Sequence, residues 1–390
     1  MPSTALVNGR VVLPGRVLER AGVLMRDGKL AAVGQFALPP GACVVDAAGG
    51  LILAGFIDVH LHGGGGSDFM DGTPESFCRI ARTHCLHGIT AMAATTLSCP
   101  YTEMKALFDL YRAAAAQSTT ADFLGIHLEG PYIAQEARGA QNPAYIRAPS
   151  RAEVDRLMRD AGDLIVRCSC APEVTGMDYL AHTMREAGIL LAVGHSNATY
   201  SQVERAYQQG FRHVTHLYSA TPSIRKIDQR VCGGVVEAAY LLDDMTFELI
   251  GDGRHVPPEV LRLALKCKGE DRVLLITDAM RAAGTDVCES YLGADRPENR
   301  VIIEDGVAKL PDRSFYAGSI ATGDRVFRNA YREAGLPLPV ITKLMSLNPA
   351  RHLGAEGRKG SLEVGKDADV LLFGPDLSLR RVFVRGRAVA

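Results

Sequence analysis

The sequence lacks an excess of either charge and a long apolar run, and its first residues lack a basic and apolar stretch; each absence argues against a class of protein. Lys and Arg number 43 against 44 Asp and Glu, a net charge of −1, whereas nucleic-acid and anionic-membrane binders normally carry a basic excess. No apolar run approaches the roughly 20 residues that span a bilayer. The first residues, Met1–Thr4, form no basic and apolar stretch of the secretory type. We therefore expect neither nucleic acid nor a membrane as a partner.

The cysteines also lack a paired framework. They number nine, an odd count, and are scattered along the chain, which favours reduced thiols in a soluble cytoplasmic protein. With 47% hydrophobic and 22% charged residues, the chain can form a large packed core, so global disorder is excluded. Its 390 residues correspond to two or three domains at about 150 residues each, although a barrel enzyme occupies about 250 as one.

The two ends of the sequence are similar in character. The first 50 residues are rich in Val, Leu and Gly, with turn signals at Asn8-Gly9, Pro14-Gly15 and Asp27-Gly28, which predicts short strands. The last 30 residues show the same pattern. We expect the two ends to meet in a small β-domain.

The middle of the chain alternates short apolar runs with helix-like segments. The helical stretches include 103–116, 151–161, 200–209 and 258–266. The predicted strands are 56–62, 89–96, 123–129, 164–169, 189–195, 214–218, 247–251 and 273–278. Eight such repeats indicate an α/β protein with the repeat number of a TIM-type (β/α)8 barrel. A doubly wound sheet would produce similar alternation, so the pattern alone leaves both architectures open.

Polar side chains gather where the predicted strands end, which is the face that carries active sites in a TIM barrel. His60 and His62 are two residues apart on one strand, so both imidazoles point to one side. The other strand-end candidates are Glu129, His195, His216 and Asp278. One carboxylate and two imidazoles provide a three-ligand set that leaves a position open for water, as catalytic Zn²⁺ sites require. A divalent metal lowers the pKa of its bound water, and Asp278 would accept that proton and return it to the leaving group.

Each candidate also has an ordinary structural interpretation. A single histidine at a strand end is usually hydrogen-bonded within the fold, and a single aspartate such as Asp278 commonly caps a helix. We assign that structural role to the remaining candidates, His84, His87, His182, His213 and His352. The six strand-end candidates, however, occupy the same end of five separate strands, which structural roles alone do not predict. The arrangement indicates a metal-dependent hydrolase.

Five motifs containing these residues resemble those of the N-acetylglucosamine-6-phosphate deacetylases of the amidohydrolase superfamily. They are Gly55-Phe-Ile-Asp-Val-His-Leu-His-Gly63, His127-Leu-Glu-Gly-Pro-Tyr132, Gly194-His-Ser-Asn-Ala-Thr199, Thr215-His-Leu-Tyr218 and Thr277-Asp-Ala-Met-Arg-Ala-Ala-Gly284. The resemblance extends to Ala317-Gly-Ser319, Asn348-Pro-Ala350 and the segment 360–370, and so spans almost the whole chain.

The resemblance implies a fold, a metal site and an assembly. The fold is a (β/α)8 catalytic barrel over residues 55–355, with a small β-sandwich built from residues 1–54 and 356–390. Metal ligation falls to Glu129, His195 and His216, with Asp278 as general base and acid. Family members that keep two histidines on the first strand can hold a second metal, so His60 and His62 allow one or two metals per subunit. Zn²⁺ is the first expectation, and Fe²⁺, Co²⁺ or Mn²⁺ also suit the ligand set. The usual assembly is a homodimer.

The substrate contacts depart from the family pattern. Thr-His-Leu-Tyr continues as Ser219-Ala220-Thr221 instead of Asn-Ala-Met, and Ile227 stands where the family has an arginine that holds the sugar phosphate. Isoleucine cannot supply that contact. The nearby Arg225, Lys226 and Arg230 either substitute for it or form a solvated loop cluster, whereas His255 keeps a second phosphate contact. Gln141 replaces a family histidine that helps to polarise the amide carbonyl, and glutamine can still donate a hydrogen bond.

Three functions are therefore compared. The first is hydrolysis of the N-acetyl amide of an amino sugar phosphate, N-acetylglucosamine 6-phosphate. The second keeps this chemistry for another hexosamine phosphate, an unphosphorylated acetamido sugar or an N-acyl amino acid. The third is a non-catalytic binding protein on the same barrel, which the persistence of all the ligand candidates disfavours.

Overall fold

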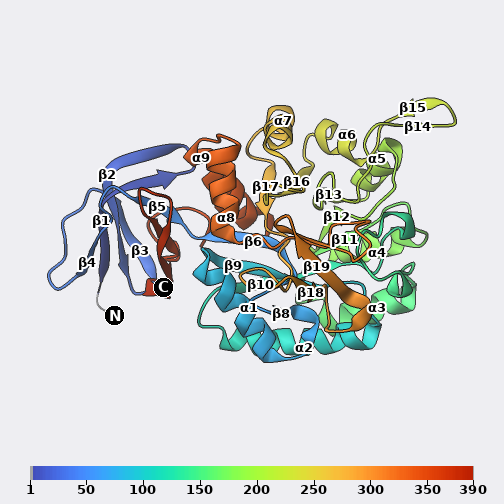
Figure 1. Cartoon of the computed structure of the whole chain (residues 1–390), viewed down its shortest axis with the longest axis horizontal. Coiled ribbons are helices and arrows are strands. Elements are labelled where there is room, and N and C mark those ends of the chain that lie inside the picture. Colours follow the sequence, from blue (N-terminus) through green and yellow to red (C-terminus); the bar gives the residue numbers. More distant parts are fainter. Residues whose placement is uncertain (1–2, 390) are drawn as a thin grey trace.

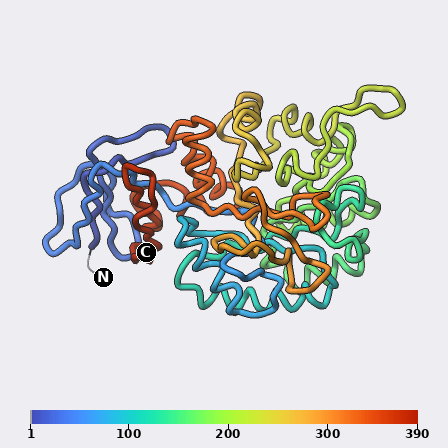
Figure 2. The backbone as a smooth tube through the Cα atoms, viewed as in Figure 1, coloured from blue at the N-terminus to red at the C-terminus, as the bar shows by residue number. Residues whose placement is uncertain are grey.

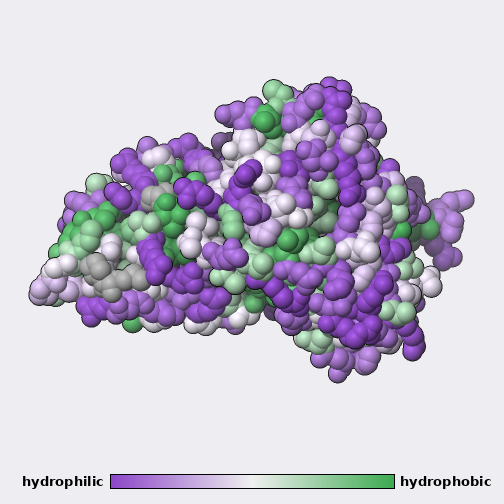
Figure 3. All heavy atoms as spheres, turned by 90° about the horizontal axis from the view of Figure 1, so that it is seen from below, coloured by the Kyte–Doolittle hydropathy of each residue, from purple (hydrophilic) through white to green (hydrophobic). Residues whose placement is uncertain are grey.

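The computed structural model describes residues 3–389. It consists of a large barrel and a smaller β-domain beside it (Figure 1). Among the described residues, no helix is both long and apolar enough to cross a membrane. Hydrophilic residues cover most of the face seen in Figure 3.

The barrel is built from eight strands, each pairing in parallel with its neighbours in the order β17-β16-β13-β12-β11-β10-β9-β6. The first and last strands of this order meet as well. Leu61, at the end of β6, forms a parallel bridge with Ala279, just beyond β17, and this bridge closes the ring. This closure confirms the predicted TIM-type barrel and excludes a doubly wound sheet. The strands are β6 (Phe56–Leu61), β9 (Ile89–Thr95), β10 (Asp122–Glu129), β11 (Ile165–Cys170), β12 (Leu190–Val193), β13 (Phe211–Val214), β16 (Thr246–Ile250) and β17 (Val273–Ile276).

Helices surround the barrel and bury one face against it. In α3 (Arg151–Ala161), for example, Val154, Leu157 and Ala161 are buried at helical spacing, and the Ser150 side chain caps the first turn by accepting a hydrogen bond from the Glu153 N–H. The others are α1 (Pro74–Leu86), α2 (Tyr101–Gln117), α4 (Met177–Glu186), α5 (Tyr200–Gln208), α6 (Val235–Leu241), α7 (Pro258–Lys268), α8 (Gly323–Arg328), α9 (Leu338–Thr342) and α10 (Asn348–His352). Two π-helical turns, Asn329–Glu333 and Lys343–Leu347, flank α9.

The small β-domain combines both ends of the chain, blue and red in Figure 2. They form one eight-stranded sheet. Its N-terminal strands are β1 (Thr4–Leu13), β2 (Arg16–Arg26), β3 (Lys29–Gly34), β4 (Cys43–Asp46) and β5 (Leu51–Ala54). They join β21 (Val370–Phe373), β22 (Leu379–Val384) and β23 (Arg387–Ala388) through the antiparallel pairing of β5 with β21. A separate apolar core, which includes Val23, Ile52, Val370 and Phe383, holds this sheet together. The terminal β-domain is therefore present as expected.

One predicted strand is displaced in the structure. The sequence predicts the sixth strand at 214–218, but β13 ends at Val214, and residues 215–218 form a turn. His216 and Tyr218 have positive φ angles there, 30° and 79°, which a strand does not allow. His216 therefore lies beyond the strand and not within it.

Short strands also form outside the two main sheets. The hairpin of β14 (Arg225–Ile227) and β15 (Arg230–Cys232) projects from the body of the molecule (Figure 1). A three-stranded sheet of β18 (Glu289–Tyr291), β19 (Arg300–Glu304) and β20 (Val307–Lys309) precedes a loop at the barrel mouth, and β7 (Gly63–Gly64) pairs with β8 (Ser67–Asp68).

Candidate metal centre

Six side chains converge at the carboxyl ends of the barrel strands. His60 lies on β6 and Glu129 ends β10, whereas His195, His216 and Asp278 each lie two residues beyond a strand end. These three residues have φ angles of 47°, 30° and 49°, a left-handed region that side chains other than glycine rarely adopt. His62 follows β6 by one residue. The strained turns redirect three side chains away from the strand alternation.

Glu129 is the centre of the first group. Its Oε1 lies 3.2 Å from Nε2 of His195 and 3.0 Å from Nε2 of His216. The two Nε2 atoms are themselves only 3.2 Å apart. His60 also belongs to this cluster, with its Nε2 3.5 Å from Glu129 Oε1.

The other ring nitrogen of each histidine already has an acceptor. His195 Nδ1 lies 2.9 Å from the Ala137 carbonyl, and His216 Nδ1 lies 3.0 Å from the Ser219 carbonyl. Since a carbonyl only accepts, each Nδ1 carries the hydrogen, and in the neutral ring the lone pair is on Nε2. Two lone pairs that face each other at 3.2 Å cannot hydrogen-bond, but both can coordinate a cation.

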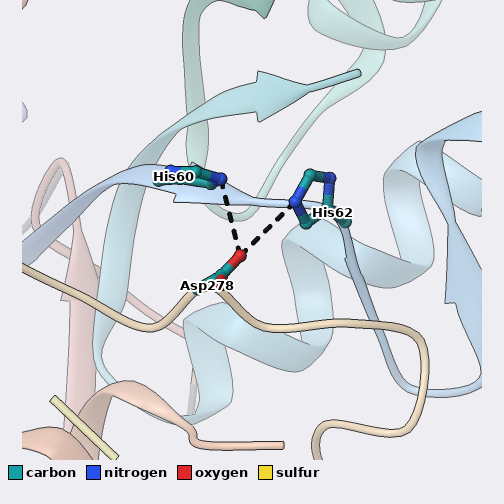
Figure 4. A group of neighbouring side chains, drawn as sticks. All are labelled: His60, His62 and Asp278. Carbon is teal, nitrogen blue, oxygen red and sulfur yellow. Dashed lines mark ion pairs between the residues drawn. The ribbon is translucent and has the colours of Figure 1, made fainter. Parts of the chain in front are cut away.

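His60, His62 and Asp278 form a second, adjoining group (Figure 4). Asp278 Oδ1 lies 3.4 Å from Nε2 of both histidines. His62 Nε2 is also 3.3 Å from Glu129 Oε2, so the Glu129 carboxylate contacts both groups.

The donor set fits a divalent cation. His60 Nε2 and Asp278 Oδ1 are buried and have no hydrogen-bond partner among the described residues. Burial alone would lower the pKa of His60, but Glu129, Glu248 and Asp278 raise it well above its ordinary value. Burial likewise lowers the pKa of His62, yet Asp278 and Glu129 raise it to about 9. The carboxylates thus create a strongly negative potential that favours a positive charge at this point.

A cavity of about 430 Å³ opens above these groups. His62, Glu129, His195, His216 and Asp278 line it, whereas His60 is fully buried beneath. The predicted substrate residues Gln141, Ser219, Ala220 and His255 also line the cavity. Arg230 does not, because it lies exposed on the projecting hairpin.

Two of these residues are held in fixed orientations. Gln141 Oε1 accepts hydrogen bonds from Ser98 N (2.8 Å) and Ser98 Oγ (2.5 Å), while its buried Nε2 has no partner in the described part of the chain. His255 Nδ1 lies 2.8 Å from Asp252 Oδ2, and its ring packs edge-on against Tyr316 at 4.8 Å. Gln141 therefore has an amide donor that no described residue uses.

Sequence reasoning missed two charged residues below the cavity. Arg167 on β11 and Glu248 on β16 are both fully buried and form an ion pair inside the barrel. The signal was available, since each one places a charge within an otherwise apolar predicted strand.

The amidohydrolase family profile matches residues 51–389. The N-acetylglucosamine-6-phosphate deacetylase of Lysinibacillus sphaericus is 33% identical over 377 residues, covering 95% of this chain and 93% of the relative. The crystal structure of the Pasteurella multocida N-acetylglucosamine-6-phosphate deacetylase superposes with a TM-score of 0.91 at 29% identity, covering 99% of both chains. An aspartate-to-alanine mutant of the Mycobacterium smegmatis enzyme, in complex with N-acetyl-D-glucosamine-6-phosphate, gives a TM-score of 0.89 at 30% identity and covers 100% of both chains.

The chain therefore belongs to the amidohydrolase family and, within it, to the N-acetylglucosamine-6-phosphate deacetylases. The fold and the family together identify a metal-dependent hydrolase.

Proposed function

We propose that the protein hydrolyses the N-acetyl amide of N-acetylglucosamine 6-phosphate, giving glucosamine 6-phosphate and acetate. The observation that carries this proposal is the convergence of imidazole Nε2 atoms on Glu129 next to an unpaired Asp278 oxygen. The similarity to named deacetylases along the full chain supports the same reaction.

Asp278 is proposed as the proton carrier. Glu129, His195 and His216 would hold a divalent metal, which would supply Lewis-acid polarisation and make a water molecule more acidic. Burial would raise the pKa of Asp278, but His60 and His62 lower it below its ordinary value, so its carboxylate is ionised and able to accept a proton. It takes the proton from the attacking water and delivers it to the departing amine nitrogen.

Gln141 is proposed to hold the acetyl carbonyl. Gln141 lines the cavity, its buried Nε2 is an amide donor without a partner among the described residues, and Ser98 holds its Oε1 and so fixes the amide. A donor in place before the reaction begins stabilises the negative charge that develops on the carbonyl oxygen.

The sugar phosphate is proposed to lie near His255, Ser219 and Ala220, which line the same cavity as Gln141. Arg225 reaches the rim, where it donates to the carbonyl oxygen of the cavity-lining Asn197. Arg230, on the same hairpin, stays a prediction as a phosphate contact.

The metal, assembly and location complete the proposal. We infer Zn²⁺ from the nitrogen and oxygen ligands, one or two ions per subunit, and the cytoplasm as the location, where all nine free cysteines would stay reduced. We infer a homodimer because Ile224, directly before the projecting hairpin, and Val231 on it are 64% and 70% exposed.

The decisive experiment compares kcat/KM for N-acetylglucosamine 6-phosphate with kcat/KM for the unphosphorylated sugar, using Zn²⁺-reconstituted protein. We expect a preference of roughly a hundredfold or more, about 2.7 kcal/mol of transition-state stabilisation. A ratio near one would instead favour the second candidate, the same chemistry on another acylated amine, which the replacement of a family arginine by Ile227 suggests.

A further inference from the structure

A buried ion pair lies inside the barrel, below the candidate metal centre. Arg167 and Glu248 are both 0% exposed, with Nη1–Oε2 at 2.5 Å and Nη2–Oε1 at 3.1 Å. Barrel interiors are usually filled with branched apolar side chains, and burying two charges removes favourable hydration. The contacts of this pair therefore bear on what it does that apolar residues could not do.

Glu248 contacts two of the residues that face the metal centre. Its Oε1 lies 2.6 Å from His60 Nδ1, the ring nitrogen opposite the one that points toward Asp278. The same oxygen accepts a hydrogen bond of 3.3 Å from the backbone N–H of His216. One carboxylate oxygen thus connects β6 with the turn that follows β13.

The contact between Glu248 and His60 determines which ring nitrogen of His60 is available as a metal ligand. Because a carboxylate only accepts, Nδ1 carries the hydrogen, and Nε2 keeps its lone pair on the side that faces Glu129 and Asp278. His60 Nε2 is the buried atom without a partner, 3.4 Å from Asp278 Oδ1. His60 is also the one residue common to both possible ligand groups in the described chain.

Arg167 keeps the carboxylate in this orientation. Besides Glu248, its guanidinium contacts three imidazoles outside the ligand groups, with nitrogen distances of 2.8 Å to His127, 3.3 Å to His352 and 3.4 Å to His213. These contacts fix both Nη atoms, so Glu248 cannot rotate away from His60 without leaving a buried cation unpaired.

We propose that Glu248, held by Arg167, is a positioning residue that makes His60 a ligand for a second divalent metal, shared with His62 and Asp278. The proposal rests on the proposed function only in requiring a divalent metal at the centre. Glu248 and Arg167 contact neither substrate nor metal, and act through the tautomer and direction of His60.

The test replaces the ion pair with apolar residues, in the double variant Arg167→Leu/Glu248→Leu. Replacing both charges avoids an unpaired buried ion, so the variant is expected to fold, which thermal unfolding checks. Co²⁺ is titrated into the metal-free full-length protein, with the visible absorption spectrum and the metal content after dialysis as readouts. We expect two equivalents in the wild type, and in the variant a 10- to 100-fold loss of affinity for one equivalent with the other unchanged.

Two further variants separate positioning from packing. Arg167→Leu/Glu248→Gln restores an acceptor for His60 Nδ1 without a charge, and is expected to recover much of the second affinity. His352→Leu removes a contact of Arg167 that does not reach His60, and is expected to keep both equivalents.

A wild type that binds one equivalent would overturn the proposal, as would an apolar double variant that binds two equivalents with wild-type affinity or loses both equally. These titrations contain no substrate. A protein that binds metal as expected but fails to deacetylate the sugar phosphate would contradict the proposed function and leave this inference standing.

Discussion

Three side chains of the candidate site have backbone angles that their residue types disfavour. His195, His216 and Asp278 follow their strands in the left-handed region, at a cost of roughly 1–2 kcal/mol each relative to ordinary conformations. The surrounding structure holds them there, as the hydrogen bond of 2.7 Å from Ser319 N to the Asp278 carbonyl illustrates. The strained turns bring these side chains to the candidate metal centre.

Asp278→Asn should abolish proton transfer while keeping the size and backbone preference of the side chain. We expect kcat to fall by about 10²- to 10⁴-fold with the metal at Glu129, His195 and His216 retained, measured by acetate release and by metal analysis. Asp305→Asn is the matched control, since Asp305 also has a positive φ, 55°, but lies in the exposed turn after β19. Near-normal turnover of the Asp278 variant would contradict the proton-carrier role.

Gln141→Leu removes the amide donor at nearly constant volume. Loss of one hydrogen bond to the developing oxyanion should lower kcat/KM by roughly 10- to 100-fold, with more of the effect in kcat than in KM. Steady-state kinetics measures both constants. The exposed Gln135, six residues earlier, provides the control Gln135→Leu, which should behave as the wild type. A Gln141 variant with unchanged kcat would show that the carbonyl is held elsewhere.

His84 should make the fold sensitive to mild acid. It is fully buried, and burial lowers its pKa to about 4, although its Nε2 hydrogen-bonds the Gly63 carbonyl. In the unfolded chain the pKa is about 6.5. Between these values the unfolded chain binds a proton that the folded chain does not, so the free energy of unfolding falls as the pH falls from about 6.5 to about 4.

The pH-dependent part of the free energy of unfolding that comes from His84 is up to about 3 kcal/mol in total. It should disappear in His84→Gln. Urea unfolding across the pH window measures the slope, and His182→Gln, at an exposed histidine, should keep the wild-type slope. Equal slopes in the two variants would refute the assignment to His84.

At the scale of the elements, the pattern of apolar residues determined which strands and helices could be predicted from the sequence. All eight barrel strands were identifiable because each is a short apolar run with a polar end, and 151–161 matches α3 at both ends. The sixth strand was misplaced because Thr215–Tyr218 alternates polar and apolar residues as a strand does, whereas its φ angles form a turn. The π-helical turns were not predicted because their spacing differs from 3.6 residues.

The residues of the candidate site could also be predicted only in part from the sequence. Residues at strand ends were predictable, because parallel strands bring their carboxyl ends to one face. Glu248 and Arg167 were not identified because their function depends on contacts across the barrel, between strands that are distant in sequence.

The proposed dimer contact at the hairpin of β14 and β15 can be tested by substitution. If Ile224 and Val231 are buried between two copies, Val231→Lys should weaken the dimer by roughly tenfold or more by desolvating a charge. Light scattering over a concentration series measures the change. Val364→Lys, at another valine that is 66% exposed, is the control. A wild type that is monomeric at all concentrations would refute the proposed homodimer.

At the scale of the whole molecule, one lysine joins the barrel to the segment leading into β21. Lys359 is 2% exposed, and its Nζ lies 2.8 Å from Asp122 Oδ2 on β10, 2.5 Å from Asp369 Oδ2 and 3.3 Å from Asp367 Oδ2. The positive charge of this buried ammonium group compensates the negative charges of the three carboxylates around it.

Lys359→Met should therefore lower the free energy of unfolding by about 3–5 kcal/mol, because it leaves the buried Asp369 carboxylate without its cation. Chemical denaturation measures the loss. Lys29→Met removes a half-exposed lysine that pairs with Asp367, and should cost less than about 1 kcal/mol. If the two variants were equally stable, the buried cluster would contribute nothing beyond a surface pair.

The shared sheet of the small β-domain also has a consequence for biosynthesis. β5 ends at Ala54, but its neighbour β21 begins at Val370. While the ribosome makes the barrel, one edge of β5 has no partner, and its four residues, all buried in the finished fold, stay open to unintended pairing. The N-terminal sheet can be completed only after the catalytic barrel has been translated, so chains that stop early would expose that edge and become substrates for chaperones and proteases.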